Sequence, residues 1–276
     1  MLRKSIKRKA SKVKLPLRGA IFSLAYDPFF GGAEIAVKEI SARLPHISFT
    51  CLTHRFDKKW LPREELGNIN IVRLGPGHSD SRYYGHPFGK ILYVWRAWRA
   101  AEASHKKEKF DFIWAIMASY GGIAALLFKL NHPKVPMLLT LQEGDSETHI
   151  LKRVGVFYPL WKKIFARADY IQAISSYLKD FATRHGARRR TPIEVVPNGV
   201  DIEKIKNKKL KIKNKKNRIF TIISTSRLVH KNGLDTLMYA AAELKKHHTP
   251  PFIVRIVGDG PEARALYSLA NKLKVF

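Results

Sequence analysis

Cysteine and acidic residues are scarce in this chain of 276 residues. The single cysteine, Cys51, excludes an internal disulfide and a cysteine-rich metal site, and it fits a reducing, cytoplasmic environment. No uninterrupted run of about 20 apolar residues is present, because the longest apolar stretch, 112–128, contains a glycine pair. The basic N-terminus has no apolar segment, so we do not expect a secretory leader.

Basic residues are abundant and unevenly placed. Lys and Arg number 51 against 22 Asp and Glu, a formal net charge of +29. Residues 1–18 and 204–218 hold eight and nine basic residues, respectively, and no acid. Such runs predict a flexible basic tail over 1–18 and a lysine-rich linker over 204–217. Residues 19–203 and 218–276 are then expected to form two domains.

Short apolar runs alternate with helical patterns, which is typical of βαβ units and a mostly parallel sheet. In the first domain we expect strands at 20–26, 47–53, 69–74, 110–117, 135–141, 170–174 and 193–196. The helices are expected at 33–44, 88–103, 121–130, 150–166 and 176–184. After the linker, strands at 219–225 and 252–257 alternate with helices at 234–246 and 262–274. Two βα units cannot cover both faces of a parallel sheet, so the second domain is expected to be incomplete.

Glycines and cations follow several of these strands. Gly31 and Gly32 open a helix, where backbone N–H groups could bind a phosphate, although an ordinary βα turn often has the same glycines. Arg227 and Lys231 follow the first strand of the second domain, at the edge where open α/β sheets bind ligands. A solvated loop is the alternative for these two cations. The Gly258–Gly260 segment is either a ligand loop or a tight turn.

Acidic residues follow the strand at 135–141. Glu143 and Asp145 could act as a base or as metal ligands, or the loop could simply cap a helix. The helix at 88–103 places Phe88, Ile91 and Trp95 on one stripe, which indicates either core packing or attachment to an anionic membrane surface.

Five segments in this order resemble glycosyltransferase family 4, from Ala20 onward: GGAE, ARADYIQAIS, VVPNGVD, SRLVHKNGLDTLMYAAAEL and VGDGPE. The resemblance implies an α/β chain of the GT-B type. It has a complete N-terminal Rossmann-like, acceptor-side domain and the first part of a second Rossmann-like domain for a nucleotide-sugar donor. It also implies a hexosyltransferase-type enzyme that transfers a sugar from a nucleotide-diphosphate sugar to a lipid-linked or polysaccharide acceptor. The resemblance implies as well that the transfer retains the configuration of the sugar carbon. It also implies that the enzyme needs no metal or other cofactor.

The resemblance also implies roles for single residues. The donor phosphates would lie on Gly31, Gly32, Arg227 and Lys231, and the nucleotide side on Gly258 and Gly260. Asn232 stands where the family usually has a lysine. Gln142 stands where many members have a histidine, which makes Gln142 and the adjacent Glu143 the catalytic candidates.

The family's two later glutamates would come after Phe276. We therefore expect a fragment with an incomplete donor site, which binds sugar nucleotides weakly and shows no transfer by itself.

Two other functions are open. A nucleic-acid-binding module would suit the charge, but the basic residues concentrate in two segments and no recognised nucleic-acid motif is present, so no specific nucleic acid is expected. A non-catalytic α/β protein that binds anions or a membrane surface is the main alternative. It can coexist with the enzyme, as a peripheral protein at the inner face of the membrane.

Overall fold

The computed structural model describes residues 16–29, 31–79, 87–203, 219–247 and 250–275. The chain divides into two compact units, Met1–Asp201 and Ile202–Phe276. Most of the expected basic tail and the expected linker over 204–217 lie outside the described residues.

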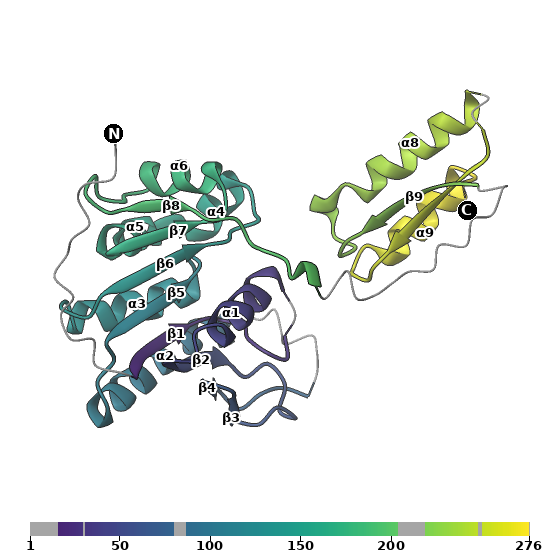
Figure 1. The fold of residues 1–276 in the computed structure, drawn as a ribbon. Coiled ribbons are helices and arrows are strands. Elements are labelled where there is room, and N and C mark those ends of the chain that lie inside the picture. Colours follow the sequence, from purple (N-terminus) through teal and green to yellow (C-terminus); the bar gives the residue numbers. More distant parts are fainter. Residues whose placement is uncertain (1–15, 30, 80–86, 204–218, 248–249, 276) are drawn as a thin grey trace. The chain divides into compact units, whose positions relative to one another are not determined.

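The first unit is built on one sheet with the strand order β3-β4-β2-β1-β5-β6-β7-β8 (Figure 1). Neighbouring strands are parallel except β3 and β4, which confirms the expected α/β fold with a mostly parallel sheet. The strands are β1 (Leu17–Phe22), β2 (Ile47–His54), β3 (Arg63–Leu66), β4 (Ile69–Leu74), β5 (Phe112–Ile116), β6 (Met137–Leu141), β7 (Tyr170–Ala173) and β8 (Ile193–Val195).

Helices cover both faces of this sheet. Ala20 and Phe22 of β1 belong to one core cluster, whereas Ile21 between them belongs to another, because successive strand residues point to opposite faces. The first cluster receives side chains from α2 (Pro87–Lys107), α3 (Tyr120–Asn131), α5 (Tyr158–Arg167) and α6 (Ser176–Arg184). The second receives Ala33 and Val37 from α1 (Gly32–Ala42).

Three local expectations for the first unit need correction. The first strand begins at Leu17, so the end of the expected tail belongs to the sheet, where the Arg18 backbone N–H donates to Asp111 Oδ2 at 2.8 Å. The helix expected over 150–166 is interrupted. It runs as α4 (Glu147–Val154), a 3₁₀ turn (Gly155–Phe157) and α5, because Gly155 adopts a positive φ of 50°. Strand β3 was not expected, since its sequence REEL is largely charged.

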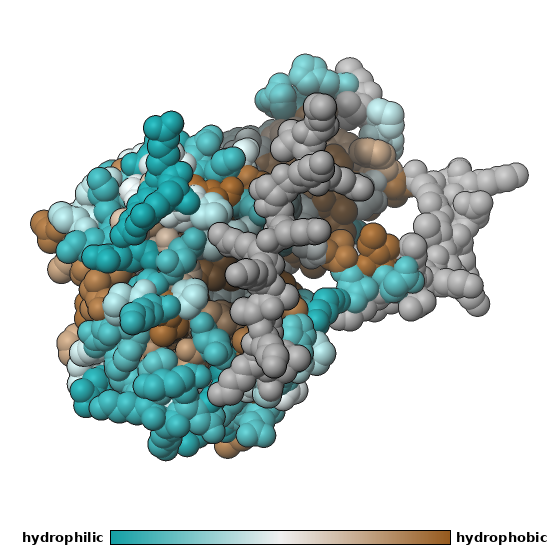
Figure 2. Space-filling model, turned by 60° about the vertical axis from the view of Figure 1, so that its left-hand side comes forward, coloured by the Kyte–Doolittle hydropathy of each residue, from teal (hydrophilic) through white to brown (hydrophobic). Residues whose placement is uncertain are grey.

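Helix α2 does not bury its aromatic stripe. Tyr93 and Ala97 are fully buried, whereas Phe88 and Trp95 are 62% and 56% exposed. Core packing is therefore the wrong explanation for this part of the stripe. Figure 2 shows hydrophobic residues exposed between hydrophilic ones on one face of the molecule. Among the described residues, no helix is long and apolar enough to cross a membrane.

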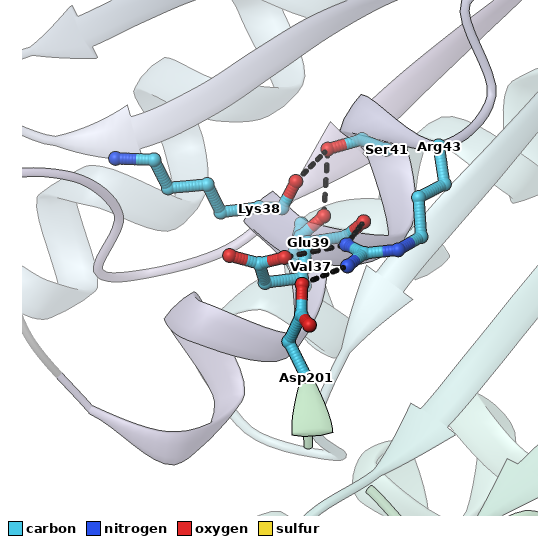
Figure 3. A network of polar contacts seen from close by, with 6 residues as sticks. All are labelled: Val37, Lys38, Glu39, Ser41, Arg43 and Asp201. Atoms are coloured by element: carbon cyan, nitrogen blue, oxygen red, sulfur yellow. Dashed lines mark hydrogen bonds and ion pairs between the residues drawn. The ribbon is translucent and has the colours of Figure 1, made fainter. Parts of the chain in front are cut away.

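The end of the first unit is fastened to α1. Arg43 Nη2 donates to Asp201 Oδ2 at 3.2 Å, and Arg43 Nη1 donates to the Glu39 carbonyl at 2.8 Å (Figure 3). Ser41 Oγ donates to the Val37 carbonyl at 2.6 Å, which satisfies its buried hydroxyl within the helix. The last residue of the VVPNGVD segment therefore contacts α1 through this ion pair.

The second unit contains a parallel pair, β9 (Phe220–Thr225) and β10 (Phe252–Val257), with α8 (Leu234–Lys246) and α9 (Ala263–Lys272). The βαβα order is the expected one. Leu228, Leu234 and Leu266 form its small core cluster. Phe220 and Ile223 of β9 remain exposed, so the described helices do not cover both faces of this pair.

One buried ammonium in the first unit gives a test of the fold. Lys129 Nζ donates to the Pro133 and Val135 carbonyls and to Asp169 Oδ2, at 3.0, 2.7 and 2.6 Å, and its side chain is only 7% exposed. Lys129→Met should therefore lower the free energy of unfolding by about 1–3 kcal/mol, because three part-buried hydrogen bonds of the ammonium are lost. Urea unfolding measures this change. The exposed Lys134→Met is the control, and equal losses in both variants would contradict the assignment.

Candidate functional site

The Gly31-Gly32 loop ends at the first turn of α1. Gly31 is the N-cap residue, with extended backbone angles of −145° and 167°. Gly32 is exposed, and a methyl group placed on it would meet no atom of the described residues within 4 Å. At Gly31, in contrast, a methyl group would overlap Glu34 Oε2. The Glu34 carboxylate therefore lies on the Gly31 side of the helix N-terminus, and the described residues leave the Gly32 side open.

In the second unit, Arg227 and Lys231 lie on the loop after β9. Both side chains are exposed. Asn232 Nδ2 donates to the Arg227 carbonyl at 2.7 Å, so the asparagine that replaces the family's lysine fixes the loop backbone. Gly233, the N-cap residue of α8, has a φ of 63°, a conformation that favours glycine. The structure thus places both cations on one braced loop at the carboxyl end of a parallel strand.

The Gly258–Gly260 segment packs directly against the Arg227 loop. Leu228 N donates to the Asp259 carbonyl at 2.9 Å, and Glu262 N donates to the Leu228 carbonyl at 3.0 Å. A methyl group on Gly258 would overlap the Ser226 carbonyl oxygen, and one on Gly260 the Leu228 carbonyl oxygen. These glycines are therefore needed for backbone packing, whether or not they also face a nucleotide.

A cavity of the second unit lies elsewhere. It measures about 520 Å³ and is lined by residues such as Met238, Pro250, Phe252 and Val275. Phe252 is the first residue of β10, whereas Val257 and Gly258 are at its other end. This apolar cavity is therefore at the opposite end of the strand from the phosphate-binding candidates.

Gln142 and Glu143 follow β6 but have different surroundings. Gln142 is buried, and its Oε1 accepts a hydrogen bond from Asn198 Nδ2 at 3.1 Å. It therefore ties the VVPNGVD segment to the end of β6. Glu143 Oε1 accepts from the Ala118 backbone N–H at 2.6 Å, just before α3. Met117, which precedes Ala118, has a φ of 64°, a strained conformation of the kind that clusters at functional sites.

Glu143 is suited to proton transfer at neutral pH. Its Oε2 is buried without a hydrogen-bond partner among the described residues. Burial raises the pKa of Glu143 to about 7, although the Ala118 N–H and the positive charge of Arg153 oppose the shift. A carboxyl with this pKa can both release and accept a proton near pH 7. Asp145 instead lies 3.5 Å from Arg153, as an ion pair.

Two features of the site were not anticipated. Arg153 acts on Glu143, and His54 lies buried at the end of β2 with its Nδ1 unpartnered. The sequence shows that Arg153 is a cation and that His54 ends a strand, but it does not show what either residue contacts. Among the described residues, no group of three or more His, Cys, Asp or Glu could hold a metal ion. Metal-independent transfer stays a prediction.

Two family models match the chain. Glycosyltransferase Family 4 matches residues 30–204, and Glycosyl transferases group 1 matches residues 203–275. A curated relative, the uncharacterized glycosyltransferase MJ1069 of Methanocaldococcus jannaschii, is 29% identical over 287 residues, which cover 94% of this chain and 67% of that protein.

Solved structures share the fold. Sucrose-phosphate synthase from Thermosynechococcus elongatus superposes with a TM-score of 0.68 at 14% identity, covering 94% of this chain and 68% of that chain. HepE of Anabaena, in complex with UDP and glucose, gives a TM-score of 0.60 at 16% identity, with 95% and 67% covered. An E. coli trehalose-6-phosphate structure bound with UDP-2-fluoro glucose gives a TM-score of 0.60 at 16% identity, and the match covers 93% of this chain and 68% of that chain. The chain thus spans about two thirds of the length of these relatives, whose common fold is of the GT-B type.

The raised pKa of Glu143 predicts a pH-dependent stability. The folded protein holds this proton up to about pH 7, whereas the unfolded chain releases it near the ordinary value of 4.5. The stabilisation that the protonated Glu143 carboxyl gives the fold is fully present below pH 4.5. It is lost as the pH rises through 7, because the buried carboxylate is then charged. Glu143→Gln removes this loss. Its free energy of unfolding relative to the parent should rise by roughly 2–3 kcal/mol between pH 4 and pH 8.

Denaturant unfolding at the two pH values measures this difference. Glu194→Gln is the control, since Glu194 is exposed on β8. A difference for Glu143→Gln that does not change with pH would show that the Glu143 carboxyl titrates normally.

Proposed function

The chain belongs to glycosyltransferase family 4, a family of sugar-transferring enzymes, and we propose that it uses a nucleotide-diphosphate sugar as donor. The proposed acceptor is a lipid-linked carbohydrate or a polysaccharide, and the proposed transfer retains the configuration of the sugar carbon. The observation that carries the proposal is the family match over residues 30–204, joined by the group 1 match over 203–275. The UDP and UDP-sugar bound to HepE and to the E. coli structure support a uridine nucleotide as the donor carrier.

On the donor side, the chemical need is to stabilise a leaving diphosphate. Cleavage of the bond between sugar and phosphate builds negative charge on the phosphate oxygens. In this proposal Arg227 and Lys231 bind those oxygens, as cations on a loop whose backbone accepts a hydrogen bond from Asn232. In the first unit, the exposed N–H side of Gly32, at the positive end of α1, is a separate candidate donor for a phosphate.

On the acceptor side, Glu143 is the proposed proton-handling group. A neutral carboxyl can donate a hydrogen bond to a sugar oxygen, and its ionised form can accept the proton of the acceptor hydroxyl. The pKa of about 7 makes both forms available at neutral pH. Gln142 has no such proton to exchange, and we assign it the positioning of the VVPNGVD segment through Asn198.

Contact with an anionic membrane would suit a lipid-linked acceptor. Phe88, Ile91 and Trp95 are exposed at spacings of three and four residues on α2, so they share one side of the helix. Exposed aromatic side chains of this kind enter the membrane interface, and basic residues are attracted to its anionic lipids. This favours a peripheral position at the membrane for the proposed enzyme.

Donor binding tests the proposal directly. Saturation-transfer NMR should detect contact with UDP-glucose and a weaker contact with UMP, because only the former carries the diphosphate and sugar. Gly32→Ala should lower the affinity for UDP-glucose about tenfold, since the methyl group fits the folded protein but obstructs a close phosphate. Unchanged thermal unfolding is the control for Gly32→Ala. Equal binding of UMP and UDP-glucose, in both proteins, would refute a donor site here.

Catalysis separates the two residues after β6. In a longer homologue that carries the same glutamine-glutamate pair, the change equivalent to Glu143→Gln should lower kcat by about 100-fold or more, as expected for loss of a general acid or base. The change equivalent to Gln142→Asn should have a much smaller effect on kcat, because it only shortens the tether to Asn198. Initial-rate kinetics measure both. Similar small effects would return both side chains to purely structural roles.

A further inference from the structure

Five cationic or titratable side chains gather at one edge of the first unit. His54 ends β2 and pairs in register with Leu74, which ends β4. Lys90 and Arg96 come from α2, whose first turn lies against His54. His78 and Lys90 contribute positive charge at His54, and Arg153 of α4 contributes it at Lys90. We call His54, His78, Lys90, Arg96 and Arg153 the His54 cluster.

Two glycines allow this close approach. A methyl group on Gly75 would lie 3.1 Å from Arg96 Nη1 and 3.7 Å from His54 Nδ1, so both nitrogens face the same point of the backbone. Gly75 has a φ of 109°, which other residues rarely adopt. A methyl group on Gly89 would lie 3.7 Å from His54 Nε2. The N-terminal turn of α2 therefore adds its positive dipole end to the cluster.

One ring nitrogen of the buried His54 is unsatisfied. The side chain is 4% exposed, and its Nδ1 is buried with no hydrogen-bond partner among the described residues. The ring packs edge-on against Phe56, with centroids 4.7 Å apart. An unpaired buried nitrogen is costly, so its occurrence at a cationic edge points to a ligand that would pair with it.

The charges of the cluster reinforce one another. Burial lowers the pKa of His54 to about 4, helped by the positive charges of Arg96, His78 and Lys90 and opposed by the Leu74 backbone. Burial and Arg153 also lower the pKa of Lys90. Among the described residues, Asp145 pairs with Arg153 at 3.5 Å, and no carboxylate is among the groups that shift His54 or Lys90. An anion bound here would relieve this repulsion.

The His54 cluster adjoins the proposed acceptor-side base. Arg153 of the cluster acts electrostatically on both Lys90 and Glu143, so one cation of the cluster is close to that carboxyl. We propose that the His54 cluster binds a phosphate group carried by the acceptor. The proposal rests on the proposed function, and it narrows the acceptor class to phosphorylated molecules. Phosphate suits the site because its several oxygens can accept from a forked guanidinium, an ammonium and a neutral imidazole N–H together.

The test measures the response of the His54 ring to added phosphate. In protein labelled with ¹⁵N at histidine, glycerol phosphate or inorganic phosphate should raise the pKa of His54 by about one unit, in a saturable way. Arg96→Gln should weaken this binding about tenfold, because it removes a charge-assisted hydrogen bond. Arg99→Gln is the matched control. It makes the same change of charge on the same helix, at an exposed residue outside the cluster, and should alter the affinity less than about twofold.

A second arm identifies the source of the phosphate. Vesicles of phosphatidylcholine with and without phosphatidic acid are compared with the soluble phosphates. Arg96-dependent binding to phosphatidic acid alone supports a phosphate carried by a lipid, and Arg96-dependent binding of glycerol phosphate supports a soluble or polymeric carrier. No response of His54 to any phosphate overturns the proposal, as does equal weakening by Arg99→Gln or equal binding of acetate. These measurements contain no sugar donor and report only phosphate binding. A protein that fails to transfer sugar can therefore be distinguished from one whose His54 cluster fails to bind phosphate.

Discussion

The parallel direction of the strands is the constraint on which the first unit's site depends. Parallel strands bring their carboxyl ends to one edge of the sheet, and the loops that leave that edge meet there. The candidate residues follow this rule, and they are Gly32 after β1, His54 at the end of β2, Gly75 after β4, Ala118 after β5 and Glu143 after β6. Burial on both faces keeps this direction fixed, since Ile21 and Phe22 of β1 belong to opposite core clusters.

Burial at this edge acts on acids and bases in opposite directions. It raises the pKa of the Glu143 carboxyl to about 7 and lowers that of the His54 imidazole to about 4. Glu143 is therefore partly neutral near pH 7, and His54 is neutral there. The fixed cations Lys90, Arg96 and Arg153 lie close to these two groups without an equal number of acids. The edge is thus prepared to bind a negative group and to exchange a proton beside it.

The sequence predicts most of this fold because the signals are local. Apolar runs and helical spacing gave β4, α8 and β10 with the observed bounds. The helix expected over 176–184 is capped by the preceding Ser175, whose Oγ accepts from Leu178 N at 3.3 Å. The misses come from backbone conformation and from edges. A positive φ at Gly155 interrupts a helical pattern, and the charged strand β3 pairs only at the rim of the sheet.

The candidate site is less predictable because its properties come from tertiary contacts. The glutamine-glutamate pair after β6 could be found from its position, but no pattern shows that Gln142 holds Asn198 while Glu143 caps Ala118 N–H. In the same way, the motif GGAE indicates a phosphate loop without revealing that Glu34 folds back over Gly31. The His54 cluster is assembled from four separate segments, so no local spacing marks it.

The large positive charge acquires meaning only where water is excluded. Exposed lysines and arginines are screened by solvent and counterions, so the total of +29 says little about a particular ligand. Lys90 and Arg96 are half-buried beside a buried imidazole, where the effective dielectric is lower and the same charges act more strongly. Specific recognition of a phosphate should therefore come from these few shielded cations. The exposed basic residues can raise the local concentration of any polyanion, but they cannot tell one from another.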